Sequence, residues 1–121
     1  MKISLPFPDA SLMPNRKNGR HWASTVGIKQ YCRILARTST PRIDDLPELI
    51  PLSVIFNSPD KRHRDLDNLL AACKAYIDGI ADALKINDRN FRPILIDFGT
   101  EQNNTVDFYI GEIKWNSSSA Q

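Results

Sequence analysis

The sequence LDNLLAACKAYIDGIADAL, residues 66–84, predicts a long amphipathic helix that begins near Asp65 or Leu66. Its apolar residues recur at helical spacing and form one stripe, which consists of Leu66, Leu69, Leu70, Cys73, Ile77, Ile80 and Leu84. Gly79 lies inside this helix, where glycine costs about 1 kcal/mol relative to alanine. A glycine retained at that cost indicates that another part of the chain packs closely against the helix there.

A second helix is expected from Ser24 or Thr25 to about Thr38. Its buried stripe is expected to consist of Ile28, Tyr31, Cys32 and Leu35. Three basic residues follow one another at steps of four along the same helix, namely Lys29, Arg33 and Arg37. A solvated helix face explains this basic ridge slightly better than a ligand-binding surface does.

Four segments around the two helices alternate between apolar and polar residues, which is typical of half-buried strands. They cover residues 2–7, 52–56, 94–98 and 106–113, with a hairpin loop expected at 101–104. The predicted order is β-α-β-α-β-β. This order predicts an α+β fold in which two main helices lie on a small mixed sheet.

The length of 121 residues indicates one domain, with residues 116–121 as a flexible tail. Hydrophobic residues make up 41% and charged residues 25%, as in ordinary globular proteins. The net charge of +2 is too small to indicate a nucleic-acid partner by itself. No apolar run approaches the roughly 20 residues of a membrane span. Cys32 and Cys73 lie in apolar helical patterns and are expected to be buried thiols in a cytoplasmic protein.

The motif Arg64-Asp65-Leu66-Asp67-Asn68 places two carboxylates at the start of the long helix. Helix capping explains part of this pattern, with Asp65 as the N-cap and Asp67 in the first turn. Capping does not explain why four of the five preceding residues, 60–64, are Lys, Arg or His. Mg²⁺ binds one or two carboxylates together with substrate phosphates, and basic residues hold a polyanion. Metal-dependent phosphodiester chemistry and plain capping are therefore about equally supported.

Two further polar positions extend this motif. Lys74 and Asp78 lie seven and eleven residues after Asp67, so in a continuous helix all three would form one stripe. Lys74 would lean toward the acidic motif, because helical side chains point toward the N-terminus. A simple surface pair between Lys74 and Asp78 is the alternative. Asp88 lies in a polar turn after the helix and would complete a cluster of three carboxylates if that turn folds back.

The combination of these motifs resembles the RusA family of Holliday junction resolvases. The similar elements are RDLDNL at 64–69, Lys74-x-x-x-Asp78, the Asn87-Asp88 turn, ISLPFP at 3–8 and the loop from Asn15 to His21. The order and length of the last two strands are similar as well. The resemblance extends from about Ile3 to Trp115, and the D-x-D-N element is its most specific part.

The resemblance implies a small homodimeric endonuclease that resolves four-way DNA junctions by paired symmetric nicks in recombination and repair. It implies Mg²⁺ as the cofactor, with Mn²⁺ as a substitute, and Asp65, Asp67 and Asp88 as metal ligands. Lys74 would stabilise the charge that develops on the phosphate or orient the attacking water. The implied DNA-binding residues are Arg16, Lys17, Arg20, Lys61, Arg62, His63, Arg64 and Asn68.

The chain departs from the family pattern at two points. Some members carry the lysine at the position of Ala71, one helical turn before Lys74. The acidic turn often contains two aspartates, where this chain has Asn87 and Asp88.

Three alternatives remain open. The first is a module that binds junctions or other branched nucleic acid without catalysis. The second is a metal-dependent nuclease that prefers flaps, forks or single strands. The third is a small structural protein in which Asp65 only caps a helix. For His21 and His63, phosphate contact or plain exposure is favoured over acid–base chemistry, and Trp22 and Tyr31 are expected in the core.

Overall fold

The computed structural model describes residues 1–13 and 22–114, and it describes side chains from residue 25 onward in the second range. The strands are β1 (Lys2–Pro6), β2 (Ile50–Asn57), β3 (Phe91–Phe98) and β4 (Thr105–Ile110). The α-helices are α1 (Trp22–Ser39), α2 (Leu66–Ala72) and α3 (Lys74–Leu84). Two short 3₁₀ turns are η1 (Ala10–Leu12) and η2 (Asp88–Asn90).

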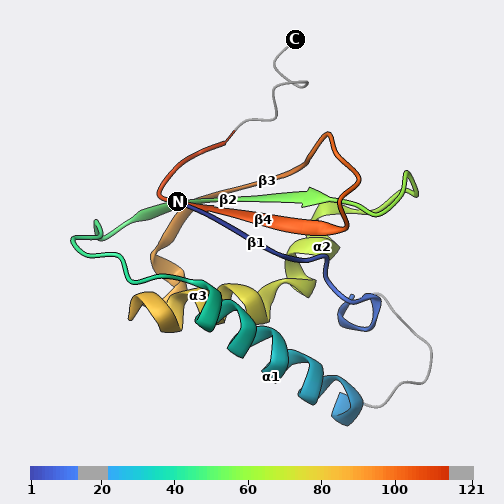
Figure 1. Ribbon diagram of the computed structural model, residues 1–121, viewed down its shortest axis with the longest axis horizontal. Helices are drawn as coiled ribbons and strands as arrows, with labels where there is room; N and C mark the ends of the chain where they lie inside the picture. Colours follow the sequence, from blue (N-terminus) through green and yellow to red (C-terminus); the bar gives the residue numbers. More distant parts are fainter. Residues whose placement is uncertain (14–21, 115–121) are drawn as a thin grey trace.

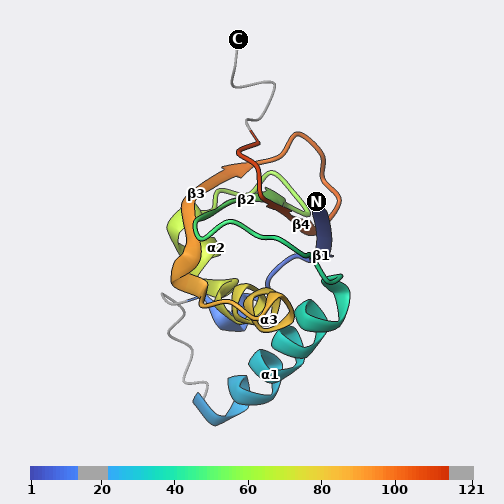
Figure 2. The same cartoon turned by 90° about the vertical axis from the view of Figure 1, so that its left-hand side faces the viewer.

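The described strands form one mixed sheet in the order β1-β4-β2-β3. All three α-helices lie on one side of this sheet, and α1 lies farthest from it (Figure 1). The view turned by 90° shows the same layers, with α1 and α3 stacked beneath the strands (Figure 2). This arrangement confirms the predicted α+β class and the mixed sheet.

The last two strands are not neighbours, so the predicted hairpin between them is wrong. β3 pairs with β2 in parallel, whereas β4 pairs antiparallel with both β1 and β2. The chain therefore crosses over β2 between β3 and β4. The physical reason is burial: in the central position between β1 and β2, the apolar residues Val106 and Phe108 are fully buried.

The sheet face that meets the helices forms the core. Leu52, Val54 and Phe56 of β2 are fully buried and alternate along the strand, as predicted. Tyr76 of α3 packs edge-to-face on Phe108 of β4, with 6.0 Å between the ring centroids. Burial of these aromatic and aliphatic side chains fixes the position of α3 beneath the sheet.

The helix predicted over residues 66–84 is divided into α2 and α3 at Cys73. Cys73 has φ −91° and ψ 4°, and its N–H donates to the carbonyl oxygens of Leu69 and Leu70. Cys73 is fully buried, and Cys32 is 7% exposed, so the expectation of buried thiols is confirmed. The break means that Lys74 begins a new helix instead of continuing the face that carries Asp67.

Gly79 lies where α3 meets α1, and the predicted close packing is confirmed. A Cβ atom on Gly79 would lie 2.2 Å from the carbonyl oxygen of Arg33 and 2.8 Å from the Cβ of Ala36. The first contact is with backbone, which cannot swing aside as a flexible side chain can. Glycine at this position therefore sets the distance between α1 and α3.

Tyr31 is not in the core, contrary to the prediction, because its side chain is 64% exposed. The buried side of α1 is formed by Cys32 and Ala36, with Ile28 and Leu35 at its margins. Tyr31 lies beyond that margin, since α1 packs mainly against α3 and buries only a narrow stripe. The side chain of Trp22 lies outside the described part of the chain.

Candidate functional site

The loop that precedes α2 is held in shape by Asp60 and Arg64. The Asp60 carboxylate accepts bonds from the Arg62 N–H at 2.9 Å and from Arg64 Nη1 at 2.8 Å. The bond from Arg64 lowers the pKa of Asp60. The Arg64 side chain is only 10% exposed, and its guanidinium lies 5.4 Å from the centre of the Phe7 ring. Arg64, predicted to contact DNA, thus lies inward as a brace of this loop.

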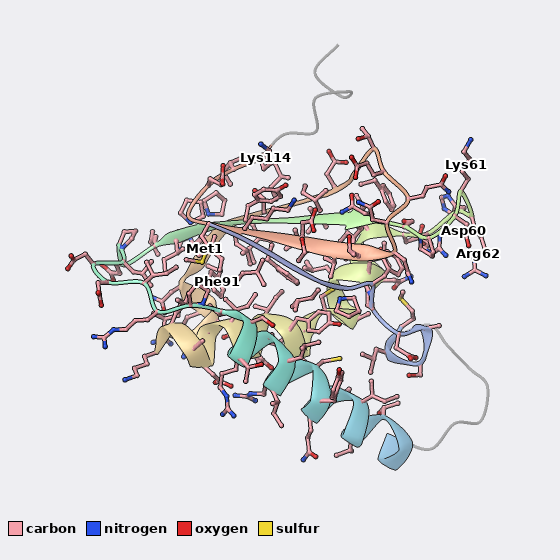
Figure 3. All side chains as sticks on the ribbon, in the orientation of Figure 1. Met1, Asp60, Lys61, Arg62, Phe91 and Lys114 are labelled. Atoms are coloured by element: carbon pink, nitrogen blue, oxygen red, sulfur yellow. The ribbon has the colours of Figure 1, made fainter. Side chains whose placement is uncertain are left out.

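The three residues between these anchors extend outward. Lys61, Arg62 and His63 are exposed, and the His63 side chain is 90% exposed. Figure 3 shows Lys61 and Arg62 projecting from the tip of the loop, beyond the end of the sheet. These three predicted DNA-binding residues are therefore accessible to a phosphate backbone.

Asp65 and Asp67 follow this loop at the start of α2, and we call them the open acidic pair. Asp65 occupies the N-cap position, but within the described chain its carboxylate makes no capping hydrogen bond. Its Oδ1 lies 3.2 Å from Nε2 of His63, and its side chain is 58% exposed. Asp67 is exposed in the first turn, and its Oδ1 accepts a bond from the N–H of Asn68 at 3.0 Å. Side-chain capping therefore does not account for the carboxylate of Asp65.

A hollow of about 410 Å³ lies beside Asp65 of the open acidic pair. It brings together five predicted site residues with η1, and it is lined by Ala10, Met13, Arg62, His63, Arg64, Asp65, Asn68 and Leu69. A basic wall and a carboxylate thus border the same hollow. This combination suits an anionic group that is bound together with a cation.

Asp78 and Asp88 form a second group, which we call the lysine-bound pair. The Lys74 ammonium donates to Oδ1 of Asp78 at 2.9 Å and also forms a hydrogen-bonded ion pair with Oδ2 of Asp88. The predicted pairing of Lys74 with Asp78 is confirmed. Asp88 begins η2, whose N-cap Asn87 accepts a bond from the N–H of Arg89 at 3.0 Å. This turn therefore folds back to the start of α3.

These ion pairs shift the protonation equilibria of the group. The bonds to Asp88 and then to Asp78 raise the pKa of Lys74. The same ammonium lowers the pKa of Asp88. Lys74 therefore stays charged at neutral pH, and so does the Asp88 carboxylate.

The three predicted metal ligands are not brought together. Among residues 1–13 and 22–114, no three His, Cys, Asp or Glu side chains converge in a way that could hold a metal ion. Lys74 contacts Asp78 and Asp88 instead of leaning toward Asp65 and Asp67. The donor chemistry of the open acidic pair nevertheless fits Mg²⁺, since two accessible carboxylates plus a substrate phosphate are a usual ligand set for this ion. A role for Asp88 as a third ligand stays a prediction.

Several predicted residues lie outside the described part of the chain, namely Arg16, Lys17, Arg20, His21, Trp115 and the tail at 116–121. Asn68 is half-buried and lines the hollow described above. No α-helix within the described ranges is long and apolar enough to cross a membrane.

An ion pair that the sequence pattern did not indicate shapes the neighbouring surface. Arg33 of α1 donates to both carboxylate oxygens of Asp82 in α3, at 2.6 Å from Nε and 2.9 Å from Nη2. The two residues are 49 positions apart, so no local spacing indicates the contact. The close approach of the helices at Gly79 is the one feature of the sequence that pointed toward it.

Comparison with known proteins adds a relative but no function. No family model matches the sequence. An uncharacterized protein of Xylella fastidiosa (strain Temecula1 / ATCC 700964) is 38% identical over 95 residues. The match covers 74% of this chain and 61% of that protein, so the chain spans less than two thirds of the relative's length. The resemblance to RusA resolvases stays a prediction.

Proposed function

We propose that this protein is a Mg²⁺-dependent, structure-selective endonuclease that resolves four-way DNA junctions by paired nicks in recombination and repair. One observation carries the proposal: Asp65 stands at the N-cap of α2 without using its carboxylate for capping. Together with Asp67 it remains exposed beside a loop of accessible basic residues. Metal-dependent cleavage of a polyanion requires this combination, whereas a purely structural helix start does not.

Each residue of the site would have its own role in phosphodiester hydrolysis. Asp65 and Asp67 would hold Mg²⁺, or Mn²⁺ in its place, and Asp88 is the predicted third ligand. The chemistry that such an ion supplies is polarisation of the scissile phosphate and a lower pKa for bound water. Lys74 would hold its proton and stabilise negative charge that develops on the phosphate, which its raised pKa supports.

The loop before α2 would hold the DNA next to these groups. Lys61, Arg62 and His63 would contact phosphates, which position the backbone without reading sequence. Arg64 would keep the loop in the right shape through Asp60 and Phe7. Asn68 would add a hydrogen bond at the hollow. The basic residues at 16, 17 and 20 are predicted to extend the same surface.

A homodimer in the cytoplasm would present two such sites to one junction. Its two-fold symmetry would match the two strands that must be cut. Both the dimer and its location belong to this proposal.

Cleavage of defined DNA structures tests the function. The purified protein would be incubated with an end-labelled mobile four-way junction, a flap, a fork and a single strand, each with Mg²⁺, with Mn²⁺ and with EDTA. We expect paired symmetric nicks in the junction with either metal ion and none with EDTA. Asp44→Asn, which removes a carboxylate that is 73% exposed and paired with Arg42, is the matched control and should cut normally.

Other outcomes would favour the alternatives. Tight junction binding without cleavage under any divalent ion would identify a non-catalytic binding module. Faster cutting of flaps, forks or single strands than of junctions would identify a nuclease of different preference. If the protein neither binds nor cleaves any of these DNA structures, Asp65 and Asp67 would have only a structural role.

A further inference from the structure

A groove lies between α1 and α3, and Leu12 of η1 and Ala71 and Ala72 of α2 also contribute to its lining. Its larger part, of about 580 Å³, is bordered by Lys29 and Arg33 on one wall and by Lys74 and Asp78 on the other. A second hollow of about 380 Å³ shares Gln30 and Arg33 with the first and adds Arg37. The two parts therefore adjoin at Gln30 and Arg33, and Lys74 lines the larger one.

Some charged side chains along this groove form ion pairs, and others do not. Asp82 is held by Arg33, and Asp78 is held by Lys74, so both groove carboxylates already have cationic partners. Lys29 and Arg37 flank Arg33 at steps of four residues, and both are exposed. Across the ranges 1–13 and 22–114, neither of these two cations forms an ion pair. Arg37 does interact electrostatically with Asp82, which Arg33 already holds. The groove therefore offers two exposed positive charges on one helix face, neither of them engaged in a close ion pair.

The spacing of the two exposed charges fits a nucleic-acid strand. Eight residues separate Lys29 from Arg37, which is about 12 Å along a helix axis. A B-form DNA arm parallel to α1 advances about 3.4 Å per nucleotide along its axis, so this distance corresponds to three to four nucleotide steps of one strand. An acidic peptide would also meet the charges, but the groove is lined by Lys74, where the proposed function already places a phosphate backbone.

The turn η1 connects the groove to the hollow beside the open acidic pair. Ala10 and Met13 line that hollow, whereas Leu12 lines the groove. A strand that leaves the hollow can thus pass the short turn and enter the groove without crossing the core.

We propose that the groove between α1 and α3 holds the sugar-phosphate backbone of one DNA arm, with Lys29 and Arg37 as its phosphate contacts. This inference rests on the proposed function and assigns the basic ridge of α1 to substrate binding instead of simple solvation. Arg33 is a positioning residue in this account, because its bidentate bond to Asp82 keeps α1 against α3. Binding through phosphates makes the contact independent of base sequence.

A charge-neutralising pair of substitutions tests the groove. The variant Lys29→Gln/Arg37→Gln would be compared with wild type for binding to the four-way junction in EDTA at several salt concentrations. We expect roughly 10- to 100-fold weaker binding near 0.1 M salt and a salt slope reduced by about 2, as the loss of two phosphate contacts predicts.

The matched control removes two charges from the opposite side of the sheet. Lys2→Gln/Lys114→Gln changes two exposed lysines that both lie over the ring of Tyr109, at 5.8 and 5.5 Å from its centre. Figure 3 shows Lys114 on the side of the sheet away from the helices. We expect this control to change junction affinity by less than about threefold and the slope by less than about 0.5.

Equal losses in the two variants would overturn the groove assignment, because net charge alone would then explain both. Unchanged binding of the groove variant would overturn it as well. In either case a wild-type protein that cuts junctions would leave the proposed function standing. A wild-type protein that neither binds nor cuts junctions would instead remove the proposed function, and the groove assignment with it.

Discussion

The open acidic pair and the lysine-bound pair contain the same residue type in different electrostatic surroundings. Asp65 and Asp67 are exposed beside a basic loop, and Oδ1 of Asp65 lies 3.2 Å from Nε2 of His63. Asp78 and Asp88 share the ammonium of Lys74. A carboxylate that is bound to an ammonium must release it before it can ligate a metal ion, whereas an exposed pair offers two oxygen ligands directly. The acidic residues of this chain are therefore not interchangeable.

The largest expected effect follows from removing a member of the open acidic pair. Asp67→Asn should lower Mg²⁺-dependent junction cleavage by at least about 1,000-fold, because metal assistance supplies several kcal/mol. Junction binding in EDTA should be unchanged. Initial rates and thermal unfolding would be measured together, and the free energy of unfolding should fall by less than about 1 kcal/mol. A variant that cuts at the wild-type rate would refute the role of this pair.

Replacing Lys74 removes the cation from the lysine-bound pair, which then resembles the open acidic pair. Lys74→Met should reduce cleavage by about 100-fold, as the loss of one charge-stabilising donor does in other enzymes. It should also raise the pKa of Asp88, since the bond that lowers it is gone. Cleavage rates and carboxyl NMR titration would measure the two effects, with Lys114→Met as the control. An unchanged Asp88 pKa would mean that the ion pair is absent in solution.

The lysine-bound pair also depends on how α3 packs against α1. Gly79→Ala should destabilise the fold by about 1–3 kcal/mol, because the new Cβ would overlap the backbone of Arg33. Gly27→Ala is the matched control on α1, where no described atom lies within 4 Å of the added Cβ. That control should stabilise by about 0.5–1 kcal/mol. Urea unfolding would compare them, and equal effects would contradict the close helix contact.

The smallest expected effect is the pH dependence of the Lys74–Asp88 interaction. The lowered pKa of Asp88 means that its contribution is present above the ordinary aspartate pKa and is lost as pH falls through the lowered value. The raised pKa of Lys74 means that its contribution is present below the ordinary lysine pKa and is lost as pH rises through the raised value. Both side chains are partly exposed, so the pair should contribute about 0.5 kcal/mol or less.

A double-mutant cycle with Lys74→Met and Asp88→Asn would measure this contribution by denaturant unfolding. The coupling should be constant near neutral pH and should decline toward both strongly acidic and strongly alkaline pH. A coupling that increases on acidification would contradict the assigned protonation states.

Local sequence patterns predicted the elements better than their arrangement. The alternation in 52–56 and the apolar stripe of 66–84 depend on neighbours a few residues away, and the corresponding elements are present. The central position of β4 depends on which strand reaches β2, and no local pattern records that. The helix break at Cys73 is also invisible locally, because cysteine and alanine are both tolerated inside helices.

In the candidate site, too, local features were predicted from the sequence and long-range contacts were not. Capping geometry was a local question, and the acidic motif does start a helix as predicted. The return of Asp88 to Lys74 depends on the turn at residues 85–90, whose path the sequence did not specify. The inward orientation of Arg64 depends on Phe7, which lies 57 residues earlier in the chain and could not be paired with it from spacing. Long-range contacts thus decide which charged residues remain accessible.

The difference between the two acidic pairs is tested most directly by metal binding without DNA. Calorimetric titration with Mn²⁺ would compare the wild-type protein, Asp67→Asn and Asp78→Asn. We expect Asp67→Asn to weaken Mn²⁺ binding by more than about tenfold, as loss of a ligand implies, and Asp78→Asn to retain it within about threefold. Loss of binding in Asp78→Asn with full binding in Asp67→Asn would contradict the account, since the metal would then belong to the lysine-bound pair.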